Sequence, residues 1–126
     1  FDAWKRRCSV NPDAEFESKL FGKDGAYASP KVGGEKYLLR HVHLLPIKEL
    51  EKIPRWLAIL KNKGRKTSNR VLVYTSASPS EHLLLFILDE PDAHKVAEMH
   101  TTEDKQLMHQ FAAVAEAFLH DRSIVA

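Results

Sequence analysis

The sequence lacks most of the features that would point to export, disulfide stabilisation or metal chemistry. Its single cysteine, Cys8, excludes an internal disulfide and is typical of a reducing cytoplasm. No apolar run is long enough to cross a bilayer, and the opening FDAWKRRCS does not have the pattern of a signal peptide. A glycine-rich phosphate loop, a nucleophile elbow, paired catalytic carboxylates and the HExxH and CxxC motifs are also missing. We therefore expect a cytoplasmic protein without a membrane partner, whose remaining chemistry belongs to histidine, lysine, arginine and tyrosine, with no cofactor and no metal.

The composition indicates a single globular domain over residues 1–126. Apolar residues make up 44% and charged residues 29% of the chain, enough for one hydrophobic core. The formal net charge is only +2, so an anionic partner has to meet a local positive patch.

Three strands are predicted from the hydrophobic pattern. Residues 37–45, YLLRHVHLL, and residues 71–76 are typical strands, and residues 77–80 form a turn into a third. This third strand contains six consecutive apolar residues, 83–88, a pattern typical of a strand buried on both faces. We expect it at the centre of an antiparallel sheet.

Helices are predicted on both sides of these strands. Asn11 and Pro12 open a helix over residues 13–20 that buries Phe16 and Leu20, and residues 22–25 end it. A loop covers residues 26–35. Residues 47–62 form a helix that Pro54 breaks or kinks, with a stripe of apolar residues: Leu50, Ile53, Leu57 and Leu60.

The closing helix begins at Thr101 or Thr102 and runs to about residue 119. Its packing stripe repeats at helical spacing: Leu107, Phe111, Val114 and Phe118. The fold class is α+β, a small antiparallel sheet of three or more strands with N-terminal helices and a C-terminal packing helix.

Histidines mark the first candidate site. His41 and His43 share one face of a strand, with their Cβ atoms about 7 Å apart. This spacing suits an acid–base couple, phosphate contacts or a metal. The same pair can also line a half-exposed face without any function. His94 and Lys95 follow the proline turn after the third strand, where loops often carry function, although a lone histidine there is often only a surface residue.

A positive loop over residues 61–70 is the second candidate. It contains five cations and no acid: Lys61, Lys63, Arg65, Lys66 and Arg70. Such a loop suits phosphate contacts with RNA, but it can equally be a solvated loop without a role. No aromatic residues for base stacking are interleaved with the charges.

Five blocks of the sequence resemble, in order and spacing, the YafO-type toxins of bacterial type II toxin–antitoxin systems. They span nearly the whole chain and read LFGKDGAY, RHVHL, VLVY, LLLFILDEPDAHKVAE and MHQFAAVAEAF. Residues 47–70 depart from the pattern, being longer and more basic. The resemblance implies a ribosome-associated, metal-independent mRNA endonuclease that inhibits translation until a cognate antitoxin binds it. An architecture like that of RelE-type toxins follows only by analogy.

The polar positions within these blocks coincide with the candidates chosen from the residues. On this interpretation His41 or His43 is the general base and His94 is the acid or stabiliser, with Lys95 and Arg40 on the phosphate. Tyr74, in the neighbouring strand, points to the same end of the sheet, and the loop over residues 61–70 docks on ribosomal RNA. The alternatives are a non-catalytic module that binds nucleic acid or a partner, and a small histidine-ligated metal protein.

Overall fold

The computed structural model describes residues 1–30 and 38–124 of the chain. Within these ranges the elements follow in this order: α1 (Asp2–Val10), η1 (Pro12–Phe16), β1 (Phe21–Ala26), β2 (Arg40–Leu44), η2 (Leu50–Lys52), α2 (Ile53–Lys61), β3 (Val71–Ser78), β4 (Glu81–Leu88), α3 (Ala93–Ala97) and α4 (Thr102–Asp121).

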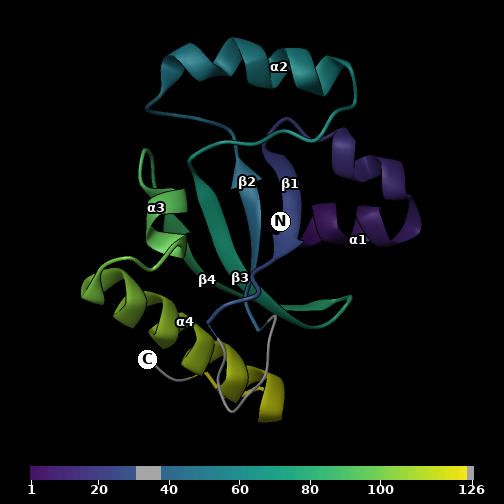
Figure 1. Ribbon diagram of the computed structural model, residues 1–126. Coiled ribbons are helices and arrows are strands. Elements are labelled where there is room, and N and C mark those ends of the chain that lie inside the picture. The colour runs from purple at the N-terminus through teal and green to yellow at the C-terminus, as the bar shows by residue number, and fades with distance from the viewer. Residues whose placement is uncertain (31–37, 125–126) are drawn as a thin grey trace.

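The four strands form one antiparallel sheet in the order β1-β2-β3-β4, which confirms the α+β class. Helix α1 packs on one face of the sheet through Trp4, and α4 packs on the other through residues such as Met108. Helix α2 lies across the end of the sheet where β2 finishes and β3 begins (Figure 1). Two faces and one end of the sheet are thus covered by different helices.

The prediction that the third strand lies at the centre of the sheet is wrong. Strand β4 is an edge strand, and Leu84, Phe86 and Ile87 are 48%, 50% and 43% exposed. The buried strand is β3, whose first five residues are all buried. A continuous apolar run shows that polar residues are absent, but it does not indicate how many strands lie beside it.

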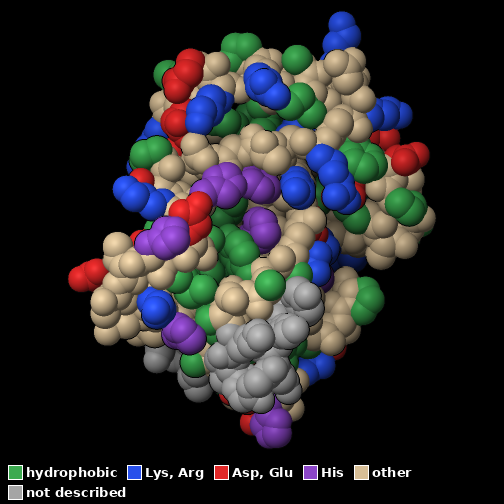
Figure 2. All heavy atoms as spheres, viewed as in Figure 1, with side chains coloured by type: hydrophobic (Ala, Val, Ile, Leu, Met, Phe, Trp, Pro, Cys, Tyr) green, Lys and Arg blue, Asp and Glu red, His purple; other side chains and the backbone are tan. Residues whose placement is uncertain are grey.

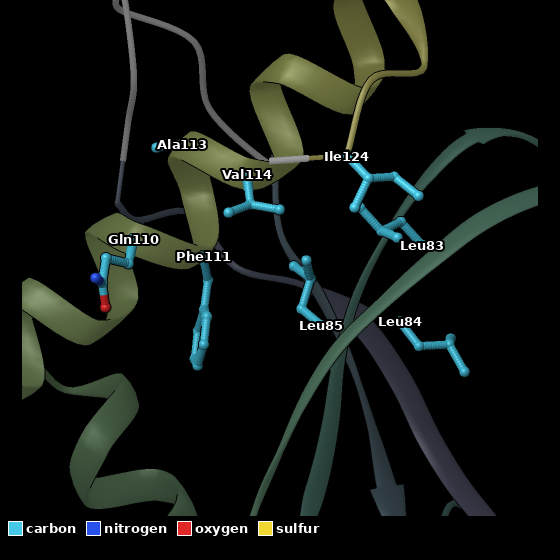
Figure 3. A pocket seen from close by; sticks show the side chains of 8 residues that line it. All are labelled: Leu83, Leu84, Leu85, Gln110, Phe111, Ala113, Val114 and Ile124. Carbon is cyan, nitrogen blue, oxygen red and sulfur yellow. The ribbon is translucent and has the colours of Figure 1, made fainter. Parts of the chain in front are cut away.

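An apolar groove of about 480 Å³ runs between β4 and α4. In Figure 3, Leu85 points from the strand into this groove and Phe111 and Val114 point into it from the helix, whereas Leu84 projects to the other side of the strand. Some apolar side chains of β4 therefore contact α4, and others are exposed to solvent.

Strand β1 occupies a segment where a turn was predicted at residues 22–25, so this prediction is wrong. Its backbone pairs with the loop before β3, where the Lys23 N–H donates to the Lys66 carbonyl at 2.7 Å. At Gly22 an added Cβ would lie 2.3 Å from that same carbonyl oxygen. The glycine permits close backbone approach inside a strand, a role that glycine often has in sheets.

The segment before β1 is less helical than predicted. The Asn11 side chain accepts from the Asp13 N–H at 3.1 Å, as expected for a cap, but the element that follows is the short 3₁₀ helix η1. Leu20 is 57% exposed instead of buried. Ala26 belongs to β1 instead of the predicted loop, and the rest of that loop lies outside the described residues from position 31 on, as does Tyr37 at the predicted start of the second strand.

The helical stretch breaks between Lys52, the last residue of η2, and Ile53, the first residue of α2, with Pro54 in the first turn of α2, in agreement with the predicted break. The predicted stripe is wrong in part, because Leu50 and Leu57 are 63% and 39% exposed. Trp56 is the buried anchor of α2, and its indole N–H donates to the Lys19 carbonyl at 2.8 Å. Because Leu50 belongs to η2 and the other members of the stripe belong to α2, the predicted stripe does not describe one helix face.

Helix α4 agrees with the sequence. The Thr101 hydroxyl accepts from the Asp104 N–H at 3.1 Å and caps it. Phe111 and Phe118 are buried, as predicted. Small side chains, such as Ala112, bring the helix close to the sheet.

Candidate active site

Three of the predicted histidines form a row at the end of the sheet below α2. The ring centroids of His41 and His43 lie 5.6 Å apart, and those of His43 and His94 lie 5.5 Å apart. His43 pairs with Val71 and Val71 pairs with Leu88, so the sheet places the end of β4, and α3 directly after it, beside His43. Histidine side chains gather below α2 in Figure 2, with lysine and arginine side chains nearby.

The two histidines of β2 are held neutral by their surroundings. Burial, reinforced by the neighbouring His43, lowers the pKa of His41 to about 4, and burial also lowers the pKa of His43 below its usual value. The His41 ring stacks on Tyr27 at a centroid distance of 4.1 Å. At neutral pH these side chains therefore act as neutral imidazoles, which donate or accept hydrogen bonds, instead of as cations.

We expect His41 to make the protein less stable in acid. Its folded-state pKa, about 4, lies below the unfolded value near 6.5, so stability is lost as pH falls through this window, by up to about 1.4 kcal/mol per pH unit. Replacing His41 by phenylalanine, which keeps an aromatic ring against Tyr27, should flatten the dependence of the unfolding free energy on pH between 6.5 and 4 in urea titrations. Equal slopes in both proteins would contradict the assignment.

His43 can be hydrogen-bonded in either protonation state. Its Nδ1 atom lies 3.0 Å from the Ser68 backbone nitrogen and 2.9 Å from the Ser68 carbonyl oxygen. A bare Nδ1 accepts from the N–H, and a protonated Nδ1 donates to the carbonyl. The Ser68 hydroxyl donates to the Leu44 carbonyl at 2.6 Å, which fixes this backbone in place. A ring that has a hydrogen-bond partner both with and without a proton on Nδ1 suits a group that exchanges a proton.

His94 stands at the entrance to a cleft of about 280 Å³ between α2 and the loop before β3. Its Nδ1 atom lies 2.7 Å from Oδ1 of Asn69. The other side chains that line the cleft are Lys52, Arg55, Trp56, Ile59, Thr67 and Ser68. Two cations and a titratable ring around one hollow can bind a phosphodiester and move a proton beside it.

Lys52, Arg55 and Asn69 were missed by sequence reasoning. The two cations occupy an ordinary amphipathic helical segment, where surface charge carries no functional signal, and Asn69 was one polar residue in a polar loop. Helix α2 packs over the end of the sheet (Figure 1), so that Lys52 and Arg55 line one cleft with His94 and with Asn69 of the loop before β3. Lys95 is exposed beside His94 in α3.

Arg40 and Tyr74 do not join the histidines. They are paired across β2 and β3 and face α1, on the opposite side of the sheet. The buried Tyr74 hydroxyl donates to Asp24 at 2.5 Å and accepts from the Arg40 Nε at 3.1 Å, and Lys5 of α1 lies 2.9 Å from the same carboxylate. Burial and Asp24 raise the pKa of Tyr74. The network joins α1 to the sheet, so the prediction that Tyr74 points to the histidine site is wrong.

The positive loop is only partly in solvent. Lys61 and Lys63 are exposed, and the exposed Arg65 lies 3.4 Å from Glu15. Lys66 is 0% exposed, with its Nζ 5.6 Å from the Trp56 ring centroid, and Arg70 lies 3.6 Å from Asp89.

The burial of Lys66 corrects its predicted role as an RNA contact. In this conformation no atom of its side chain can reach a phosphate, and burial lowers its pKa. The loop fills the space between α2 and β1, where the methylene stem of a lysine packs well against an indole ring.

Within residues 1–30 and 38–124, no group of three or more histidine, cysteine, aspartate or glutamate side chains has the arrangement of a metal site. Over the same residues, no helix combines the length and apolarity that crossing a membrane requires.

The fold and the site together define a small α+β protein with a row of three histidines beside a cationic cleft at one end of its sheet. Residues 2–120 match the family described as Toxin YafO, type II toxin-antitoxin system, and the chain belongs to this family. The resemblance found in the sequence is thereby confirmed, and membership implies a toxin that an antitoxin protein neutralises. Comparisons with curated proteins and with solved structures give no significant match.

Proposed function

We propose that this toxin is a cytoplasmic endoribonuclease that cleaves messenger RNA on the ribosome and so stops translation. The observation that carries the proposal is the pair His43 and His94, with rings 5.5 Å apart, beside a cleft that contains Lys52 and Arg55. RNA can be cut by its own 2′-hydroxyl when a base, an acid and cations surround the phosphate.

The proposed reaction needs only groups of the chain. A base removes the 2′-hydroxyl proton, O2′ attacks phosphorus, and the bond from phosphorus to O5′ breaks as O5′ takes a proton. This produces a 2′,3′-cyclic phosphate and a free 5′-hydroxyl. Lys52, Arg55 and Lys95 stabilise the charge on the phosphorane, and His94 and His43 exchange the protons.

The remaining predicted residues take supporting roles in this proposal. His41 is half-buried and neutral, and its ring packs edge-on against the ring of His43. Arg40 and Tyr74 stabilise the fold from the other face of the sheet. The exposed Lys61, at the end of α2, and the exposed Lys63 and Arg65 after it contact ribosomal RNA, where each lost phosphate contact weakens binding in a salt-dependent way.

The test is cleavage of a defined messenger on purified, programmed ribosomes. We expect cuts that leave 2′,3′-cyclic phosphate and 5′-hydroxyl ends, with activity that survives treatment of the toxin with EDTA before ribosomes in fresh magnesium are added. Binding to ribosomes without any cleavage would overturn the nuclease and favour a non-catalytic binding module. Activity that returns only with zinc would overturn the metal-independent reaction.

A further inference from the structure

A chain of side-chain hydrogen bonds leads from His94 through Asn69 to Glu49. His94 Nδ1 lies 2.7 Å from Oδ1 of Asn69, and Asn69 Nδ2 donates to Oε1 of Glu49 at 3.1 Å. The carboxylate only accepts, so it fixes the amide with its nitrogen toward Glu49 and its oxygen toward the imidazole. An amide oxygen also only accepts, so the proton of a neutral His94 is placed on Nδ1.

The far end of this chain is held firmly. Glu90 is 5% exposed and accepts from the backbone N–H groups of Ile47 at 2.7 Å and of Glu49 at 2.5 Å. The second carboxylate oxygen of Glu49 lies 2.9 Å from Lys52 Nζ. Burial alone would raise the pKa of Glu90, but the hydrogen bonds from the backbone N–H groups have the larger combined effect and lower its pKa. The Glu49 backbone is thus tied down two residues after Ile47.

We propose that Glu49 and Asn69 are positioning residues that keep His94 in the Nδ1–H tautomer, so that its Nε2 is the general base for the 2′-hydroxyl. This inference rests on the proposed function and deepens it, because it decides which histidine accepts the first proton. The proton moves from O2′ to Nε2, the bond from O2′ to phosphorus forms, and the bond from phosphorus to O5′ breaks. The departing O5′ takes its proton from the adjacent His43 ring, which is neutral in the free protein and becomes protonated because the negative charge of the bound phosphate favours the cationic form.

The arrangement matches the logic of known triads, in which an acceptor on Nδ1 selects the tautomer and leaves Nε2 ready to accept. A histidine side chain in water favours the opposite tautomer, with its proton on Nε2. Without Asn69 the nitrogen that faces the substrate would therefore carry a proton and could not act as a base.

The first measurement is ¹⁵N NMR of the histidine rings in the whole chain, which reports the tautomer without any RNA. We expect the Nδ1–H form of His94 in the wild type and in Asn69→Asp, which keeps an acceptor, and the Nε2–H form in Asn69→Ala. Asn62→Ala, an exposed asparagine at the end of α2, is the matched control and should leave His94 unchanged.

The second measurement is cleavage as a function of pH. Asn69→Ala should lower kcat by about 10- to 100-fold with KM nearly unchanged. Asn69→Asp should restore much of the rate. It should also move the acidic limb of the pH–rate profile to higher pH, because a carboxylate favours protonated His94. A wild type with its proton on Nε2 overturns the inference whether or not RNA is cut. The predicted tautomer without cleavage overturns the proposed function and leaves the positioning intact. If the Asn69→Ala variant keeps both the tautomer of His94 and the cleavage rate of the wild type, Asn69 is not a positioning residue.

Discussion

Replacing His94 by alanine is expected to lower the rate of mRNA cleavage by about 100- to 10,000-fold, the usual contribution of a general acid or base. His94 is exposed, and among the described residues its side chain hydrogen-bonds only to Asn69, so its removal leaves no cavity. The unfolding free energy should change by no more than about 0.5 kcal/mol, as for other surface substitutions. Rates on programmed ribosomes and urea unfolding curves measure the two effects separately.

His109→Ala is the matched control for this experiment. His109 is an exposed histidine on α4, away from the cleft, and its loss should leave both rate and stability unchanged. Antitoxin binding should survive in both variants and confirms that the surface is intact. A His94→Ala protein that cuts RNA at the wild-type rate would place the base elsewhere in the histidine row.

Replacing Trp56 by alanine is expected to lower the free energy of unfolding by about 3–5 kcal/mol. Trp56 is 1% exposed and ties α2 to the rest of the chain. Its Cη2 atom would lie 2.8 Å from a Cβ at Gly22, so the ring fits directly against β1. Trp56 is the only buried residue of α2 (Ile53–Lys61), so it is the main anchor of this helix.

Two further substitutions separate the causes of this effect. Leu57→Ala should cost less than about 1 kcal/mol, since this side chain is 39% exposed and loses far less apolar contact on truncation than the buried Trp56. Trp56→Phe keeps most of the apolar volume and should cost about 1 kcal/mol more than its volume loss, for the hydrogen bond to Lys19. Urea denaturation at equilibrium measures all three. Equal costs for Trp56→Ala and Leu57→Ala would show that α2 is anchored by other contacts.

Loss of Trp56 should also affect the candidate active site. Arg55 precedes Trp56 in α2, and both line the cleft. A loosened helix no longer holds Arg55 and Lys52 over the phosphate, so the residual folded protein should cleave RNA more slowly. This links the packing of α2 to the chemistry that we propose for His94.

Local patterns in the sequence were sufficient for several parts of the site. The two-residue period of a strand puts His41 and His43 on one face whatever the strand's neighbours are, and the structure shows them so. The cap at Thr101 and the buried Phe111 of α4 also depend on contacts within one helix and its own apolar face. These interactions involve residues close in sequence, so their pattern is visible in the chain.

The sequence by itself determined the α+β class, the shared face of the two histidines, the closing helix and the family. Only the tertiary structure decided that β4 is an edge strand, that Lys66 is buried and that Tyr74 faces α1. It also brought Asn69 and Arg55 to His94. The physical reason is that periodicity fixes which side chains of one element point the same way. The partner that each face meets depends on strand order and on how α2 packs, and both are set by contacts between residues far apart in the chain.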